Sequence, residues 1–134
     1  MNAKNKTPTG PLVSIVDDNV SVRRSTRRLL GCCGLRAEAF ASAEDFLQSG
    51  RVPETACLLL DVRMPGMDGL ELQRRLGETH RLIPIIFLSA RASEEEEHCA
   101  LRAGAADFLR KPVSKEALLR AIRAVLKIPV NYQC

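Results

Sequence analysis

The feature that most constrains the fold is an alternation, repeated five times, between a short apolar run and a stretch with helical spacing. The apolar runs lie at Leu12–Val16, Leu35–Phe40, Ala56–Leu60, Pro84–Leu88 and Ala106–Leu109. Each run has the length of a strand and lacks strict apolar/polar alternation, which is typical of strands covered on both faces. The pattern therefore predicts an α/β fold, a single domain whose five-stranded parallel sheet has helices on both faces.

The segments between the apolar runs carry helix signals. The stretch from Val20 to Leu30 places apolar residues on one side and four arginines on the other, namely Arg23, Arg24, Arg27 and Arg28. Leu70–Leu76 predicts the third helix. Serines that precede the second, fourth and fifth helical stretches are expected to be N-caps: Ser42, Ser93 and Ser114.

The length of 134 residues suits one domain. We expect residues 1–10 to be a flexible tail, residues 11–127 to form the domain, and residues 128–134 to begin a linker or form a C-terminal tail. No apolar stretch approaches the roughly 20 residues of a membrane span, and the polar start of the chain does not resemble a secretory signal. The expected location is the cytoplasm, without membrane contact.

The composition limits the classes of partner and metal. Lys and Arg number 20 against 16 Asp and Glu, a formal charge of +4. Such an excess is compatible with nucleic-acid or membrane contact, but a charged surface is the simpler interpretation. The chain has one Tyr and no Trp, so no stacking platform for single strands is predicted. The five cysteines form no CxxC or Cys/His cluster, so no zinc site is expected.

Polar residues follow four of the predicted strands at their carboxyl ends. Asp17 and Asp18 follow the first strand, Asp61 the third, Ser89 the fourth and Lys111 the fifth. Ligands of open parallel sheets bind beyond the carboxyl ends of the strands. If these strands are neighbours, three carboxylates, a hydroxyl and an ammonium group therefore converge at one edge.

This combination predicts phosphoryl chemistry. Three adjacent carboxylates repel one another unless a cation neutralises them, and their hard oxygens suit Mg²⁺. A metal-bound carboxylate beside Lys111 and Ser89 is suited to holding a phosphoryl group. Asp61 is the best candidate for a nucleophile that forms an aspartyl phosphate. Each residue alone has an ordinary explanation, such as Asp18 or Asn19 capping a helix, so the prediction depends on the set.

Four motifs carry a resemblance to a known family: Val16–Asp18, Leu60–Gly69, Ser89–Ala90 and Lys111–Pro112. Over residues 11–127 the sequence closely resembles the receiver domain of bacterial two-component response regulators. The resemblance implies a flavodoxin-like (βα)5 fold with strand order 2-1-3-4-5. The stretches 40–47, 61–67 and 103–112 resemble the FixJ-like group of these regulators.

The resemblance also implies a role for each site residue. Asp61 matches the phospho-acceptor. Asp18 and Asp61 match direct Mg²⁺ ligands, Asp17 matches a ligand that acts through water, and the backbone carbonyl of Arg63 matches the remaining protein ligand. Lys111 matches the lysine that pairs with the phosphoryl group, and its peptide bond to Pro112 is expected to be cis.

Two further residues match the conformational switch of the family. Ser89 matches the switch hydroxyl, and Phe108 matches the aromatic switch position. Since Phe108 lacks the hydroxyl of the Tyr that is frequent there, only burial and ring packing can report the switch. Arg63 and Arg91, each two residues after a key position, are expected to crowd or hold the phosphoryl group, so that hydrolysis takes many minutes.

The expected function is to accept a phosphoryl group from a sensor histidine kinase and to switch conformation. The output implied is transcription, through a DNA-binding domain that is absent from this chain; a stand-alone receiver or a phosphate-independent interaction module is the alternative. Such a domain catalyses its own phosphorylation and slow dephosphorylation, but it is a signalling domain rather than a conventional enzyme. DNA contact by the receiver itself is not expected.

Two surfaces are candidate partner sites. A phosphorylation-dependent homodimer is expected through helix four, strand five and helix five. A two-fold axis would pair the acidic residues Glu94–Glu97 of one copy with basic residues on the fifth helix of the other: Lys115, Arg120, Arg123 and Lys127. The alternative is two solvated helix faces. The arginine face of the first helix is the candidate surface for the kinase.

Two other classes of protein share part of this pattern. A haloacid-dehalogenase-like phosphatase also uses a nucleophilic Asp and Mg²⁺, but it requires a second Asp at the position that Arg63 occupies. A flavodoxin-like FMN carrier requires a phosphate-binding loop after the first strand. Here that loop is Asp17–Asn19, which repels phosphate in the absence of a metal.

Overall fold

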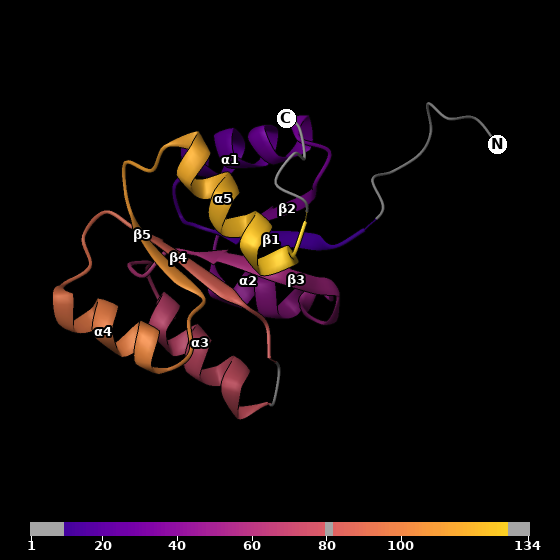
Figure 1. The fold of residues 1–134 in the computed structure, drawn as a ribbon. Helices are drawn as coiled ribbons and strands as arrows, with labels where there is room; N and C mark the ends of the chain where they lie inside the picture. Colours follow the sequence, from indigo (N-terminus) through magenta and orange to yellow (C-terminus); the bar gives the residue numbers. More distant parts are fainter. Residues whose placement is uncertain (1–9, 80–81, 129–134) are drawn as a thin grey trace.

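The computed structural model describes residues 10–79 and 82–128. Most of the predicted N-terminal tail and of the C-terminal linker lies outside the described residues. The elements are β1 (Leu12–Val16), α1 (Val20–Cys32), β2 (Arg36–Phe40), α2 (Ala43–Gln48), the 3₁₀ turn η2 (Val52–Glu54), β3 (Thr55–Leu60), α3 (Gly69–Glu78), β4 (Ile85–Ser89), α4 (Glu94–Arg102), β5 (Asp107–Arg110) and α5 (Lys115–Leu126). The fivefold alternation of strand and helix is confirmed (Figure 1).

The five strands form one parallel sheet in the order β2-β1-β3-β4-β5, as the resemblance implied. β1 and β3 lie side by side within it, and Val16 pairs with Leu60 at their carboxyl ends. The backbone N–H of Asp61 donates to the carbonyl of Val16 at 3.1 Å. Asp17 and Asp61, which directly follow these two strands, therefore lie side by side at the same edge of the sheet.

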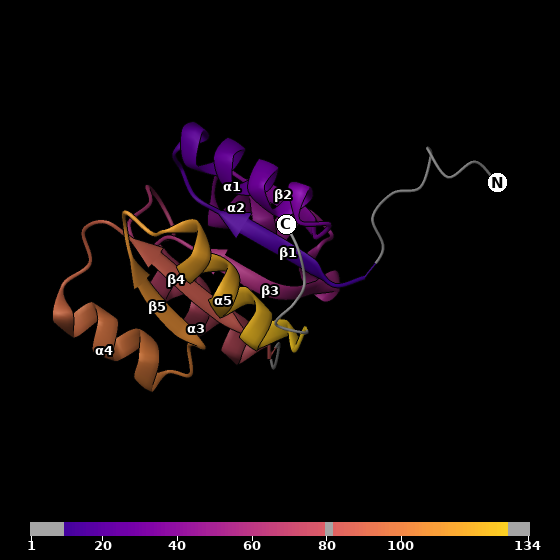
Figure 2. The same ribbon diagram turned by 45° about the horizontal axis from the view of Figure 1, so that its top comes forward.

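Helices cover both faces of the sheet. α1 and α5 lie on one face and α2, α3 and α4 on the other, as Figures 1 and 2 show from two directions. Two separate hydrophobic clusters result, because successive side chains of a strand point to opposite faces. Leu58 and Leu60 pack with Phe46 on the α2–α3–α4 side, while Leu59 packs with Ile122 on the other side.

The edge strands β2 and β5 differ from the prediction that every strand is covered on both faces. All five residues of β2 are only half-buried, and Phe108 is the one buried residue of β5; each of these strands pairs on one side alone. The inner strands β1 and β4, by contrast, are buried along their whole length. The apolar runs thus predicted the strands correctly, but not the exposure of the two edges.

The helix starts agree with the cap predictions. The side chains of Ser42, Ser93 and Ser114 each accept a hydrogen bond from the backbone three residues on. Asn19, rather than Asp18, caps α1, so Asp18 remains available to the site. Asp68 caps α3, a role that the sequence pattern did not reveal. Among the described residues, no helix is long and apolar enough to cross a membrane.

Candidate functional site

The loops that follow β1 and β3 bring the three predicted carboxylates together. Ligand oxygens of Asp17, Asp18 and Asp61 all lie within 4.8 Å of one another. Asp17 is buried, Asp61 is 9% exposed, and Asp18 is exposed to solvent. A cluster of carboxylates that is closed on one side and open on the other suits a hydrated cation.

Lys111 reaches this cluster from the end of β5. Its Nζ lies 2.8 Å from Asp17 Oδ2 and 3.6 Å from Asp61 Oδ2. Burial alone would lower the pKa of Lys111, but the hydrogen bond and charge of Asp17, with the charge of Asp61, hold that pKa above its usual value. The Lys111–Pro112 peptide bond is cis, as predicted. Lys111 is therefore a charged partner of two carboxylates from two other strands.

The carboxyl group of Asp61 is disfavoured as an anion. Burial raises its pKa, Lys111 opposes this rise, and the negative charges of Asp17 and Asp18 add to it. A single ammonium group does not balance three carboxylates. The donor set, three carboxylates with only hard oxygen atoms, therefore fits Mg²⁺.

The loop after Asp61 is held by close backbone contacts. The N–H of Gly69 donates to the carbonyl of Val62 at 2.9 Å, and a Cβ atom at position 69 would collide with the Asp61 carbonyl oxygen. Farther along the loop, the Met67 N–H donates to the Glu44 carboxylate of α2 at 3.0 Å, and this bond lowers the pKa of Glu44. The start of α3 thus fixes the backbone of the candidate acceptor.

The two predicted switch residues lie on the adjoining strands. Ser89 is fully buried, and its Oγ accepts hydrogen bonds from the N–H groups of Arg91 at 3.3 Å and Ala92 at 3.1 Å. Phe108 is also buried and stacks on Phe87, with ring centroids 5.7 Å apart. Their movements, and the role of Phe108 burial and ring packing in reporting the switch, remain predictions.

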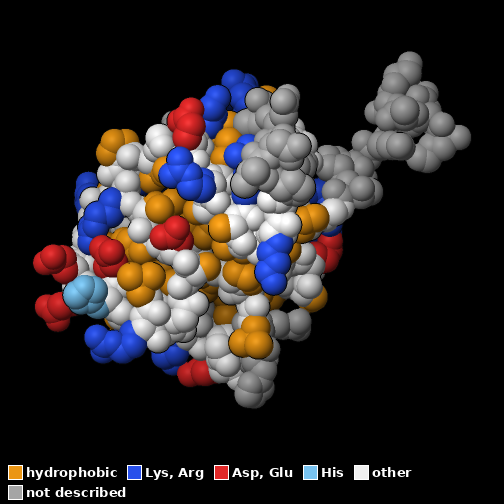
Figure 3. Space-filling model, in the orientation of Figure 1, with side chains coloured by type: hydrophobic (Ala, Val, Ile, Leu, Met, Phe, Trp, Pro, Cys, Tyr) orange, Lys and Arg blue, Asp and Glu red, His pale blue; other side chains and the backbone are white. Residues whose placement is uncertain are grey.

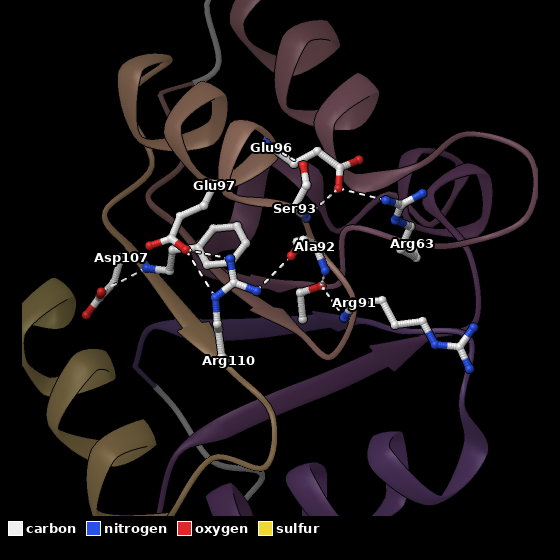
Figure 4. A network of polar contacts seen from close by, with 10 residues as sticks. Arg63, Arg91, Ala92, Ser93, Glu96, Glu97, Asp107 and Arg110 are labelled. Atoms are coloured by element: carbon white, nitrogen blue, oxygen red, sulfur yellow. Dashed lines mark hydrogen bonds and ion pairs between the residues drawn. The ribbon is translucent and has the colours of Figure 1, made fainter.

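Three arginines form contacts that sequence reasoning missed. Arg23, assigned to the arginine face of the first helix, donates to the backbone carbonyl of Asp17 at 2.8 Å. Figure 4 shows two more on the α4 side. Arg63 pairs with Glu96 at 2.8 Å, and Arg110 pairs with Glu97 at 2.7 Å while donating to the carbonyl of Ala92. Spacing along the chain gives no signal for such contacts, since Arg63 and Glu96 are 33 positions apart.

The fold and the site together define a receiver domain of a two-component system. The chain belongs to the response regulator receiver domain family, which it matches over residues 13–123. It is 44% identical over 117 residues to the response regulator protein TodT of Pseudomonas putida, covering 87% of this chain and 52% of TodT. It is 42% identical over 123 residues to the transcriptional regulatory protein TdiR of Thauera aromatica, covering 92% of this chain and 54% of TdiR.

A solved structure agrees with this assignment. FixJ-N superposes with a TM-score of 0.79 at 34% identity, covering 91% of this chain and 98% of that chain. The predicted family, its FixJ-like group and the flavodoxin-like fold are thereby confirmed. The phosphatase and flavin-carrier alternatives are set aside. The chain spans about half the length of the curated relatives that it matches.

Proposed function

We propose that this receiver accepts a phosphoryl group on Asp61 from a phosphohistidine of a sensor histidine kinase, in a Mg²⁺-dependent reaction. The observation that carries the proposal is the placement of Asp61 between two other carboxylates and the Lys111 ammonium group, within 4.8 Å and 3.6 Å respectively. A site for a phosphoryl group needs both kinds of charge: carboxylates that hold a metal ion, and a cationic side chain that binds a phosphoryl oxygen.

In the proposed step an Asp61 carboxylate oxygen attacks the phosphorus atom. The P–N bond to the kinase histidine breaks, and its electron pair stays with the imidazole. Asp18 and Asp61 would hold Mg²⁺ directly, Asp17 would hold it through water, and the backbone carbonyl of Arg63 would be the remaining protein ligand. When bound, the ion neutralises charge on the phosphoryl oxygens. Lys111 exchanges part of its contact with Asp17 for a phosphoryl oxygen.

The signal would leave the site through Ser89 and Phe108. A phosphoryl oxygen offers the Ser89 hydroxyl a charged acceptor, which favours a movement toward Asp61. Such a movement withdraws the Oγ from the N–H groups of Arg91 and Ala92 and shifts the loop before α4. We propose that phosphorylation shifts a two-state equilibrium of this kind, with the packing of Phe108 as its second reporter.

The kinase surface proposed here is the exposed side of α1. Arg24 and Arg28 line a surface pocket between α1 and α5, together with Lys115. Basic residues around a pocket suit an acidic kinase surface, because complementary charge speeds the encounter. This assignment places the kinase beside the open, Asp18 side of the site.

The homodimer surface proposed here is formed by α4, β5 and α5. Figure 3 shows acidic side chains gathered at the edge of the molecule where α4 lies in Figure 1. Two of the four glutamates on α4, Glu96 and Glu97, pair with arginines of their own chain. Glu94 and Glu95 are exposed and remain available for the basic side of α5 in a second copy.

The output proposed here is transcription. TdiR is named a transcriptional regulatory protein, and the matched region makes up only about half of each relative. We propose that residues 11–127 act as the receiver of a cytoplasmic regulator, that a linker begins near residue 128, and that a DNA-binding domain follows.

The experiment that tests this function is intact mass after incubation with acetyl phosphate and Mg²⁺. One added phosphoryl group is expected in the native chain, and none in Asp61→Asn or without Mg²⁺. Asp45→Asn, an exposed acid on α2, is the matched control and should keep the adduct. A folded native chain that gains no mass, either here or with a phosphorylated kinase, would favour the phosphate-independent interaction module instead.

A further inference from the structure

The ion pair between Arg63 and Glu96 joins the acceptor loop to the first turn of α4. Arg63 lies two residues after Asp61, and its backbone N–H donates to Asp61 Oδ1 at 3.4 Å. Its side chain, however, extends to Glu96, with Nη2 and Oε1 2.8 Å apart (Figure 4). Arg63 is therefore tethered to the acceptor through its backbone and to α4 through its guanidinium group.

Glu96 is a preorganised partner for this guanidinium. The same Oε1 atom accepts a hydrogen bond from the Ser93 N–H at 2.9 Å, while Ser93 Oγ accepts from the Glu96 N–H at 3.1 Å. This capping box fixes the Glu96 side chain. The Ser93 N–H and the charge of Arg63 also lower the pKa of Glu96, so the carboxylate stays ionised.

A phosphoryl group on Asp61 would compete for the same guanidinium. The phosphoryl group carries about −1.5 to −2 charges, in place of the single charge of the Asp61 carboxylate, and guanidinium groups bind phosphate oxygens in a bidentate manner. The pair with Glu96 is exposed, since 56% of the Arg63 side chain is accessible, and exposed ion pairs are weak. Arg63 thus has two anionic partners that compete for one side chain.

We propose that Glu96 is a positioning residue that holds Arg63 away from the phosphoryl group and so sets how long Asp61 stays phosphorylated. This inference rests on the proposed function. Hydrolysis requires a water oxygen to attack phosphorus in line. The bond from phosphorus to the Asp61 oxygen then breaks, its electron pair returns to the carboxylate, and the water oxygen with both of its protons leaves as part of dihydrogen phosphate. Arg63 laid across the phosphoryl group obstructs this approach, whereas Arg63 bound to Glu96 leaves it open.

Glu96→Gln separates the two roles of Glu96. Glutamine at this position preserves a capping box but removes the charge that holds Arg63. We expect the phosphoryl adduct, formed with acetyl phosphate and followed by intact mass after the donor is removed, to last about two- to fivefold longer than in the native chain, the range that an exposed ion pair accounts for. Asp45→Asn, which removes an exposed charge at the equivalent position of α2, three residues after the N-cap Ser42 and outside the proposed partner surfaces, should leave the lifetime unchanged.

The dependence on Arg63 completes the test. In an Arg63→Met background, adding Glu96→Gln should have no effect. Equal melting temperatures of Glu96→Gln and Asp45→Asn would show that the helix cap of α4 is intact. If Glu96→Gln folds poorly, Arg63→Met alone must shorten the lifetime. An adduct in the native chain with equal or shorter lifetime in Glu96→Gln, or an effect that survives in Arg63→Met, overturns this inference alone. A native chain without an adduct overturns the proposed function and this inference with it.

Discussion

Asp61 is an acid whose surroundings disfavour its charge, and this has a consequence for stability. Its pKa is raised by burial and by Asp17 and Asp18, with Lys111 opposing the rise. The folded state therefore binds the Asp61 proton more tightly than the unfolded state does, in which the pKa of this side chain is near 3.8. By linkage, the contribution of Asp61 to stability is lost as pH rises from that value through the folded pKa.

Asp61→Asn should consequently be more stable than the native chain at neutral pH. The substitution removes a disfavoured anion and keeps the shape of the side chain, so its Tm should exceed that of the native chain. The advantage should shrink as pH falls through the raised folded pKa toward 3.8, because native Asp61 becomes protonated over that range. Thermal unfolding by circular dichroism between about pH 4 and pH 7, in the absence of Mg²⁺, measures both effects. A lower Tm for Asp61→Asn at neutral pH would contradict this account.

Lys111→Met should destabilise the chain in a manner that Mg²⁺ reverses. The substitution leaves buried Asp17 without its partner at 2.8 Å. A buried polar group left without its partner costs about 1–3 kcal/mol, and a charged group costs more. A divalent cation held by the carboxylates would replace the lost charge. Urea unfolding should therefore show a larger stabilisation by Mg²⁺ in Lys111→Met than in the native chain. Equal Mg²⁺ effects in the two proteins would argue against an ion at these carboxylates.

At the scale of elements, α3 positions the site through its first residue. Gly69 packs directly against the backbone of the candidate acceptor, since any Cβ at this position would meet the carbonyl oxygen of Asp61 and the Cα of Val62. Gly77, near the other end of the same helix, has nothing within 4 Å of where a Cβ would lie. Within one helix, position 69 is therefore governed by tertiary packing and position 77 by helix propensity.

Substituting alanine at these two positions should have opposite effects. Gly69→Ala forces the start of α3 away from Asp61 and should cost about 3 kcal/mol or more, as overpacking against a fixed backbone does. Gly77→Ala should gain about 0.5–1 kcal/mol, because alanine is the better helix former. Urea unfolding of both variants checks this. A neutral Gly69→Ala would show that the loop after Asp61 yields more easily than its contacts indicate.

At the scale of the whole molecule, the charges of α4 and α5 lead to a prediction about assembly. The beryllofluoride complex with Mg²⁺, a mimic of the phosphorylated state, should shift the chain from monomer toward dimer in sedimentation equilibrium. Glu95→Lys or Arg120→Glu alone should weaken that dimer about tenfold, because a two-fold axis repeats each rim contact. Their combination should restore it, because the charges are exchanged across the interface. Identical sedimentation with and without beryllofluoride would contradict the dimer.

Much of this molecule follows from its sequence. Five apolar runs of strand length and a serine before each of three helices were enough for the elements, because burial on both faces and backbone capping leave local patterns. The rule that ligands lie at the carboxyl ends of parallel strands was enough to group Asp17, Asp61 and Lys111 in one site. The strand order came from the resemblance to receivers, since alternation alone does not decide which strands are neighbours.

Only the tertiary structure decided the contacts that join distant segments. It showed β2 as a half-buried edge, Arg23 bound to the Asp17 carbonyl, and Arg63 bound to Glu96. Each depends on how different elements of the chain pack against one another. Neither residue spacing nor composition predicts which side chains this packing brings into contact. The residue types at the strand ends thus determine the chemistry of the site. The ion pair proposed to set the lifetime of the phosphoryl group, by contrast, depends on how the helices pack around the sheet.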